Sequence, residues 1–211
     1  MASQALFFLS SSISLLILSI SFSQSYSSFS LSTVLAINYH DQNSLAFIQD
    51  TCRRTGYYDI CVSSLESDPR SFNADSVGVA RISIELAKAN ATGVLNYINN
   101  LISDTKNVSQ SIKSCQELYQ NAISELQTAI GFLDAANYLQ TNVKISEAFG
   151  DTVNCNSEQI RRASSMRLEE LPSALTQMNE MMIIHYKISL DILCSRFLKC
   201  PGSPYPPPSW S

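Results

Sequence analysis

Six cysteines are the residues of this chain that are best able to do chemistry, because they can pair as disulfides or bind a metal as thiolates. We do not expect a zinc site, since the sequence contains no Cys-x-x-Cys and its two histidines, His40 and His185, are far apart. An even number of cysteines favours disulfides over free thiols, but six cysteines can pair in fifteen different ways. They are Cys52, Cys61, Cys115, Cys155, Cys194 and Cys200.

The sequence separation of the cysteines indicates which disulfides can form easily and which cannot. Cys52 and Cys61 flank an Arg-Arg-Thr-Gly turn, so a local bridge forms readily and is worth roughly 2.7 kcal/mol in the chain-entropy treatment. On a continuous helix, Cys194 and Cys200 would lie about 9 Å apart along the axis, too far to bond. They can pair if the helix ends before Cys200, since Pro201 and Gly202 follow, and otherwise they are free, buried thiols. The sequence leaves both outcomes open.

No set of catalytic residues is evident. His185 flanks an apolar helical face without an obvious partner, so we interpret it as structural rather than catalytic. Glu169 and Glu170 are adjacent and would not face each other on a helix, which indicates a solvated turn rather than a paired-carboxylate site. We therefore expect neither an enzyme nor a bound cofactor.

The N-terminal region predicts secretion. The first forty residues contain no Asp, Glu, Lys or Arg, and Leu6–Ile20 is an apolar run of signal-peptide length. We predict a signal peptide at residues 1–23 and a Ser-rich spacer at 24–42. The alternative, an uncleaved membrane anchor, would need a longer run with fewer serines. The folded domain is expected at 43–198 and a proline-rich tail at 201–211.

Composition fits one ordinary domain with its own hydrophobic core. The chain has 211 residues, of which 45% are hydrophobic, and a net charge of −4. No basic patch stands out, so nucleic acid is not an expected partner, and neither is a membrane once the signal peptide is removed. Asn90-Ala91-Thr92 and Asn107-Val108-Ser109 are candidate glycosylation sequons.

The rest of the pattern is helical. No proline occurs between Pro69 and Pro172, which favours long helices over a turn-rich β fold. Apolar residues recur at helical spacing in four segments, 79–101, 112–133, 143–155 and 175–197, and Asp75 can cap the first. Four amphipathic helices with short connections predict an up-down-up-down four-helix bundle. The expected core face of the last helix consists of Leu175, Met178, Met182, Ile183, Tyr186, Leu190, Leu193 and Phe197.

Four of the cysteines lie where predicted helices are expected to pack against each other. Residues 43–52 and 57–65 read as two short helices around Gly56, which a Cys52–Cys61 bridge would hold as a hairpin ahead of the bundle. Cys115 and Cys155 lie on the apolar faces of the second and third bundle helices. A bridge between them would stop these helices sliding and is worth roughly 3.9 kcal/mol in the same treatment.

An ordered set of short motifs resembles a known family. Each motif is a weak signal alone, but together they occur in a fixed order with four cysteines at matching positions. The set continues through Cys115 and Tyr119 to the stretch "NVKISEAFGDTVNC", which ends at Cys155. Over roughly residues 43–198 it resembles the plant invertase and pectin methylesterase inhibitor family. The earlier motifs are Thr51-Cys52, Tyr58-Asp59-Ile60-Cys61, Ser64-Leu65 with Asp68-Pro69, Ala74-Asp75 and Ile84-Glu85-Leu86-Ala87.

This resemblance implies an all-α fold, a disulfide-bonded four-helix bundle with an N-terminal helical hairpin. It implies the pairs Cys52–Cys61 and Cys115–Cys155. It also implies a secreted inhibitor of a plant carbohydrate-active enzyme, located in the apoplast or cell wall or in the vacuole.

The target is less constrained than the fold. In the family, one branch covers the cleft of pectin methylesterase with bundle helices, and the other inserts a Pro-Lys-Phe segment near the start of a helix into acid invertase. The matching place here is Val143-Lys144-Ile145, where only Lys144 agrees. We therefore expect pectin methylesterase as the target, with acid invertase as the alternative and a non-inhibitory bundle as the second. Lys144 is either a target contact or a solvated lysine.

Overall fold

The structure is a computed structural model that describes residues 43–104, 109–163, 173–198 and 200. Of residues 156–163 and 173 it describes the backbone alone. Several sequence-based expectations lie outside these residues. They are the signal peptide at 1–23, the spacer at 24–42, the tail at 201–211, the sequon residue Asn107, and the turn residues Glu169, Glu170 and Pro172.

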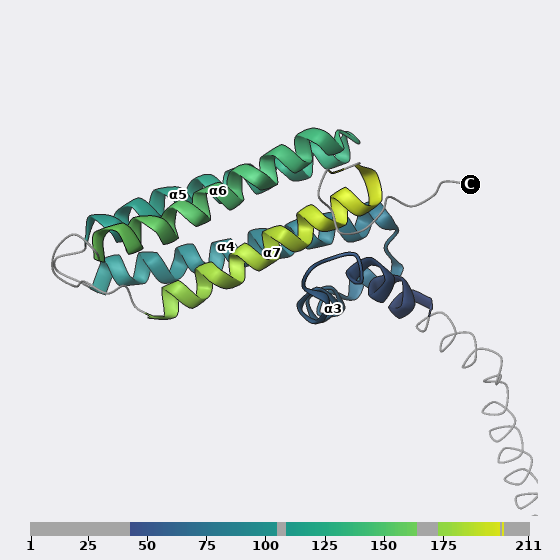
Figure 1. Ribbon diagram of the computed structural model, residues 1–211, viewed down its shortest axis with the longest axis horizontal. Coiled ribbons are helices and arrows are strands. Elements are labelled where there is room, and N and C mark those ends of the chain that lie inside the picture. The colour runs from purple at the N-terminus through teal and green to yellow at the C-terminus, as the bar shows by residue number, and fades with distance from the viewer. Residues whose placement is uncertain (1–42, 105–108, 164–172, 199, 201–211) are drawn as a thin grey trace, which may run out of the picture. The chain divides into compact units, whose positions relative to one another are not determined.

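Four long helices form a closed bundle (Figure 1). Each helix packs against the next along the chain, and the last also packs against the first, which is the neighbour pattern of an up-down-up-down bundle. The predicted all-α bundle is therefore confirmed, and the described residues contain no strand. The helices are α4 (Ser76–Asp104), α5 (Gln110–Asp134), α6 (Tyr138–Ala163) and α7 (Ser173–Phe197).

The core lies largely where helical spacing placed it. The predicted faces of α4 and α5 are mostly buried, and Asp75 caps α4 by accepting a hydrogen bond from the Gly78 N–H at 2.8 Å. Fully burying a large aliphatic side chain stabilises the fold by about 1.5–3 kcal/mol. Residues buried on these two faces include Val79, Ile82, Ala87, Ala91, Val94, Ile98, Cys115, Tyr119, Ala122, Leu126, Ala129, Ile130 and Leu133.

Helix α7 departs from the expected pattern because it is buried on a second side. Ile188 and Ile192 are buried, whereas Ile183 and Leu190 of the expected face are only partly so. Ile188 lines a small apolar cavity together with Cys61 of the N-terminal hairpin. The predicted core face of α7 was thus incomplete, because the hairpin covers part of this helix.

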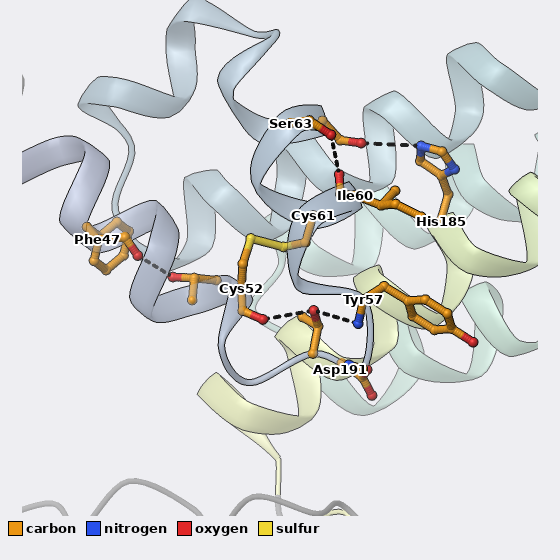
Figure 2. Close-up of a disulfide and its surroundings, with 12 residues drawn as sticks. Phe47, Cys52, Tyr57, Ile60, Cys61, Ser63, His185 and Asp191 are labelled. Atoms are coloured by element: carbon orange, nitrogen blue, oxygen red, sulfur yellow. Dashed lines mark hydrogen bonds between the residues drawn. A yellow bond between two sulfur atoms is a disulfide. The ribbon is translucent and has the colours of Figure 1, made fainter.

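The hairpin consists of a helix at residues 43–52, a turn and α3 (Tyr58–Glu66), followed by the 3₁₀ helix η1 (Pro69–Asn73). A Cys52–Cys61 disulfide joins its two helices at the turn, and Figure 2 shows Asp191 and His185 of α7 beside it. The Gly56 N–H donates to Asp191 Oδ2 at 3.1 Å. The hairpin is therefore fastened to α7 as well as to itself.

Arg196 makes the second attachment of the hairpin, near the end of α7. Its Nη2 donates to Thr51 Oγ1 at 2.7 Å and to Asp50 Oδ2 at 3.0 Å, and its guanidinium lies over the Phe47 ring. A charge-assisted bond of this kind is stronger than a neutral one. The chain leaves α7 after Phe197, and Cys200 bonds back to Cys194. The helix ends before Cys200, which is the condition under which the sequence allowed this pair.

A three-residue turn, 135–137, connects α5 to α6. The N–H groups of Ala136 and Asn137 donate back to the carbonyls of Leu133 and Phe132, which closes the end of α5. Ala136 has a φ of 53°, the left-handed conformation that usually takes glycine at a helix end. The turn is tight enough to set α6 directly beside α5.

Replacing Ala136 by glycine is expected to raise the free energy of unfolding by about 1 kcal/mol, because glycine adopts positive φ without a Cβ clash. Ala135 is the matched control, since its φ is −83° and a glycine there only adds unfolded-state freedom. Urea unfolding of both variants measures the difference. Similar midpoint shifts for Ala136→Gly and Ala135→Gly would contradict this explanation.

Candidate functional site

Lys144 lies in the second turn of α6 and is held by two carboxylates. Its Nζ is 2.7 Å from Glu147 Oε2 on the same helix and 2.9 Å from Glu125 Oε2 on α5. These hydrogen bonds, first that of Glu147 and then that of Glu125, raise the pKa of Lys144, and Lys144 in turn lowers the pKa of Glu147. The side chain is 25% exposed. Lys144 is therefore a paired lysine at the α5–α6 seam rather than an isolated one.

The residues beside Lys144 divide between core and surface. Ile145 is fully buried, whereas Val143 is 37% exposed and Leu139, one turn earlier, is 62% exposed. All of them belong to the continuous helix α6, so the stretch Val143-Lys144-Ile145 does not project from the bundle as a loop. We call Leu139, Val143, Lys144 and Glu147 the α6 surface. It combines exposed apolar side chains with a neutralised charge pair.

Negative charge continues along α6 beyond this surface. Partial burial is the main cause that raises the pKa of Asp151, and repulsion from Glu125 and Glu147 adds to it. Among the side chains that the structure describes around Lys144, Asp151, Glu125 and Glu147 supply three carboxylates and Lys144 supplies one ammonium. This part of the α5–α6 seam is therefore acidic at neutral pH.

A disulfide and a buried polar cluster hold the helices beneath this surface. Cys115 of α5 bonds to Cys155 of α6 with a Cα–Cα distance of 4.8 Å. Beside it, the Tyr119 hydroxyl donates to Asn179 Oδ1 of α7 at 2.6 Å, and Asn179 Nδ2 contacts Cys155 Sγ at 3.5 Å. Burial raises the pKa of Tyr119 well above its usual range, so its hydroxyl stays protonated and able to donate. These contacts join α5, α6 and α7 inside the core.

Sequence reasoning missed Asn179, although a signal for it was present. Asn179 follows Leu175 by four residues and precedes Met182 by three, so it lies on the apolar face of α7 and is fully buried there. A polar residue in such a stripe needs a buried partner. Tyr119 of α5 supplies that partner.

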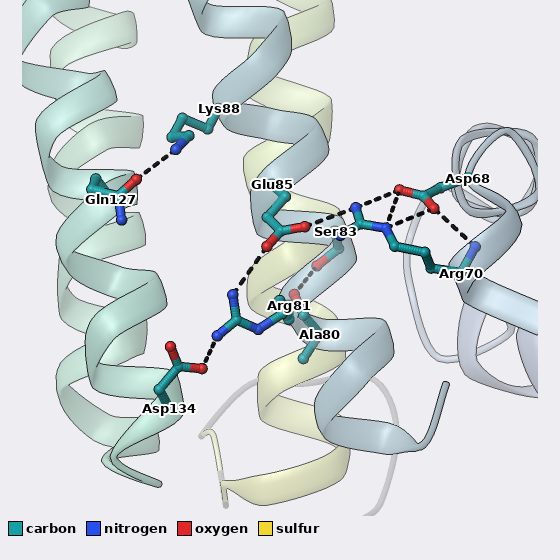
Figure 3. A network of polar contacts seen from close by, with 9 residues as sticks. All are labelled: Asp68, Arg70, Ala80, Arg81, Ser83, Glu85, Lys88, Gln127 and Asp134. Carbon is teal, nitrogen blue, oxygen red and sulfur yellow. Dashed lines mark hydrogen bonds and ion pairs between the residues drawn. The ribbon is translucent and has the colours of Figure 1, made fainter. Parts of the chain in front are cut away.

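A chain of ion pairs runs from η1 across α4 to the end of α5 (Figure 3). Arg70 of η1 binds Asp68 and Glu85, and Arg81 of α4 binds Glu85 and Asp134. Asp134 is the last residue of α5, directly before the turn to α6. The network lies mostly at the surface, where each pair contributes little to stability, but it ties the hairpin side of the bundle to the α5–α6 turn.

The remaining sequence candidates lie apart from the α6 surface. His185 of α7 meets Ser64 of α3 through Nε2 at 3.5 Å and the Met181 carbonyl through Nδ1 at 2.8 Å, so it connects the bundle and the hairpin. Asn90 is exposed on α4. Among the described residues, no group of three or more His, Cys, Asp or Glu side chains could hold a metal ion. No helix among the described residues is both long and apolar enough to cross a membrane.

Asp151→Asn is expected to raise the melting temperature at pH 7. Because the folded-state pKa of Asp151 is raised, its favourable contribution is complete below its unfolded value and is lost as pH rises through the folded value. Removing the charge should therefore stabilise the protein at pH 7 and change little at pH 3. Glu117→Gln removes an exposed carboxylate from α5 as a control. A melting temperature at pH 7 that falls in Asp151→Asn would oppose this assignment.

Comparisons with known proteins agree on one family. The family model described as plant invertase/pectin methylesterase inhibitor matches residues 46–192. A cell wall / vacuolar inhibitor of fructosidase 2 from Arabidopsis thaliana is 38% identical over 113 residues, which span 52% of this chain and 61% of that relative. A pectinesterase inhibitor from Actinidia deliciosa is 32% identical over 111 residues, which span 51% of this chain and 60% of that relative.

A solved structure supports the fold. A mutant form of a pectin methylesterase inhibitor from Arabidopsis superposes with a TM-score of 0.55 at 21% identity, covering 67% of this chain and 91% of the other. Since the family model covers more than half of the sequence and carries the hairpin and the bundle in one match, the chain belongs to the plant invertase/pectin methylesterase inhibitor family.

Proposed function

We propose that this protein inhibits pectin methylesterase by covering the active-site cleft of that enzyme with the α6 surface and the adjoining α5–α6 turn. The mechanism is steric and requires no chemistry on the inhibitor. Membership of an inhibitor family supports a protein target, and the names of relatives include pectinesterase inhibitors. The name of the Arabidopsis relative, a cell wall / vacuolar inhibitor, is consistent with secretion to the cell wall, with the vacuole as an alternative.

The ion pairing of Lys144 with two carboxylates is the observation that favours pectin methylesterase over acid invertase as the target. Insertion of a lysine into an active site requires its ammonium to leave Glu125 and Glu147, which hold it at 2.9 and 2.7 Å. Its neighbour Ile145 is fully buried and would have to leave the core. Leaving a well-packed core costs several kcal/mol, of the order measured for large-to-small substitutions at about 2–5 kcal/mol. A helix face applied to a cleft needs neither change.

Exposed apolar side chains support the choice of face. The α6 surface contains two of the large hydrophobic residues that are exposed among the described residues, Leu139 and Val143. The seam beside them is acidic, which suits a cleft rim that carries Lys or Arg. Because Cys115–Cys155 fixes α5 against α6, this face loses little freedom on binding.

Acid invertase is the second candidate, and two observations favour it. The relative of 38% identity is named an inhibitor of fructosidase, and the lysine of the family segment is kept at Lys144. A bundle that binds neither enzyme is the remaining possibility, and it would differ from both in an inhibition assay.

Titration of the oxidised protein against a plant pectin methylesterase and an acid invertase separates these outcomes. We expect stoichiometric loss of pectin methylesterase activity and no effect on invertase. Inhibition of invertase alone would transfer the proposal to the second candidate. Absence of inhibition by a helical, disulfide-bonded sample would reject both.

Leu139→Asp is expected to weaken inhibition of pectin methylesterase by more than about tenfold, because an exposed anchor of the interface is replaced by a charge. Met181→Asp is the matched control, since Met181 is 46% exposed on α7 and lies outside the α6 surface. Inhibition constants of the two variants give the comparison. Equal losses in both would remove α6 as the binding face.

Lys144→Ala tests the invertase-type contact separately. In the proposed mechanism the ammonium neutralises Glu125 and Glu147 and does not enter the target, so inhibition of pectin methylesterase should change by less than about tenfold. If invertase is inhibited and this variant abolishes that inhibition, Lys144 acts as an inserted contact instead.

A further inference from the structure

We propose that Asn90 carries an N-linked oligosaccharide and that this glycan leaves inhibition unaffected, because it lies on a part of the bundle away from the α6 surface. The sequon Asn90-Ala91-Thr92 lies within α4. Asn90 and Thr92 are exposed, whereas Ala91 between them is fully buried. The acceptor asparagine and its hydroxyl partner therefore both face solvent, while the residue between them keeps its place in the core.

The side chain of Asn90 is free to accept a sugar without loss to the fold. Its amide makes no hydrogen bond to any residue that the structure describes, and Thr92 Oγ1 bonds only to the Lys88 carbonyl, at 2.9 Å. Gly93 follows Asn90 by three residues, almost one helical turn, and a Cβ placed there would meet no atom within 4 Å apart from its chain neighbours and the adjacent backbone of its own helix. The surface next to Asn90 thus has open space for the first sugar residues.

The position of Asn90 around α4 separates it from α6. Lys88 Nζ donates to Gln127 Oε1 of α5 at 2.5 Å, so Lys88 marks the flank of α4 that faces α5 (Figure 3). Two residues further along a helix is a rotation of about 200°, which places Asn90 on the other flank. Helix α4 packs against α5 and α7, and α6 lies across the bundle from it. A glycan on Asn90 would therefore cover the α4 side and leave the α6 surface open.

The modification is a group transfer in the secretory pathway. The donor is an oligosaccharide attached to a polyprenyl pyrophosphate. A bond forms between the Asn90 amide nitrogen and the anomeric carbon of the first sugar, and the bond from that carbon to the pyrophosphate oxygen breaks. The amide nitrogen loses one proton, and the polyprenyl pyrophosphate leaves.

Mass spectrometry of the full chain produced in a plant secretory host tests the modification directly. We expect the peptide that contains Asn90 to carry a glycan. Treatment with a peptide N-glycosidase should release that glycan and convert Asn90 to aspartate. Asn90→Gln and Thr92→Ala should each abolish the modification at this peptide. An Asn90 peptide of unmodified mass in the recovered protein overturns the proposal.

The consequence for inhibition rests on the proposed function and has its own readout. Asn90→Gln and the glycosylated protein should inhibit equally, and a difference of tenfold or more would contradict the placement of the glycan. Lys144→Asn provides a comparator, because it creates a new sequon with the exposed Ser146 on the α6 surface. A glycan there should abolish inhibition, and enzymatic release of that glycan should restore it.

The two proposals can fail separately. If the protein inhibits neither enzyme, the proposed function is rejected, and the Asn90 peptide still decides whether α4 is glycosylated. If the glycosylated form of Lys144→Asn inhibits as well as the unsubstituted protein, the α6 surface is not the one that contacts the target.

Discussion

The disulfide between Cys115 and Cys155 is the constraint on which the candidate surface depends. It brings the two backbones to a Cα–Cα distance of 4.8 Å near the start of α5, and the three-residue turn at 135–137 joins the same two helices at the other end. Two helices fixed at both ends cannot slide past each other. The pairing of Lys144 with Glu125 requires that register, because the two residues come from different helices. A face held in this way can bind without first being ordered.

Helix α7 is the second organising element, because it contacts both the rest of the bundle and the N-terminal hairpin. One side packs into the bundle, with Asn179 bonded to Tyr119, and another carries the hairpin through Asp191 and Arg196. The Cys194–Cys200 bond encloses the final helical residues, among them Arg196 and the Phe197 ring that stacks on Tyr138 of α6. The end of α7 thereby connects the hairpin to the start of α6.

Local signals in the sequence were sufficient for much of this fold. Helical spacing located the buried faces of α4 and α5, and Asp75 marked the start of α4, because both features depend on residues a turn or so apart. The second buried side of α7, with Ile188 and Ile192, was missed, since Ile188 lies beside Cys61 of a hairpin more than a hundred residues earlier in the chain. The pairing of Lys144 with Glu125 was missed for the same reason. This contact cannot be predicted from either residue's local sequence, because it depends on the register between α5 and α6.

Contact between the α6 surface and the target enzyme can be measured by hydrogen–deuterium exchange of the complex. Backbone amides that lie in an interface exchange more slowly when the partner is bound. We expect slowed exchange over residues 135–147 on addition of pectin methylesterase, with exchange in α4 and the hairpin unchanged. Slowed exchange confined to α4 or to the hairpin, with residues 135–147 unaffected, would contradict this expectation.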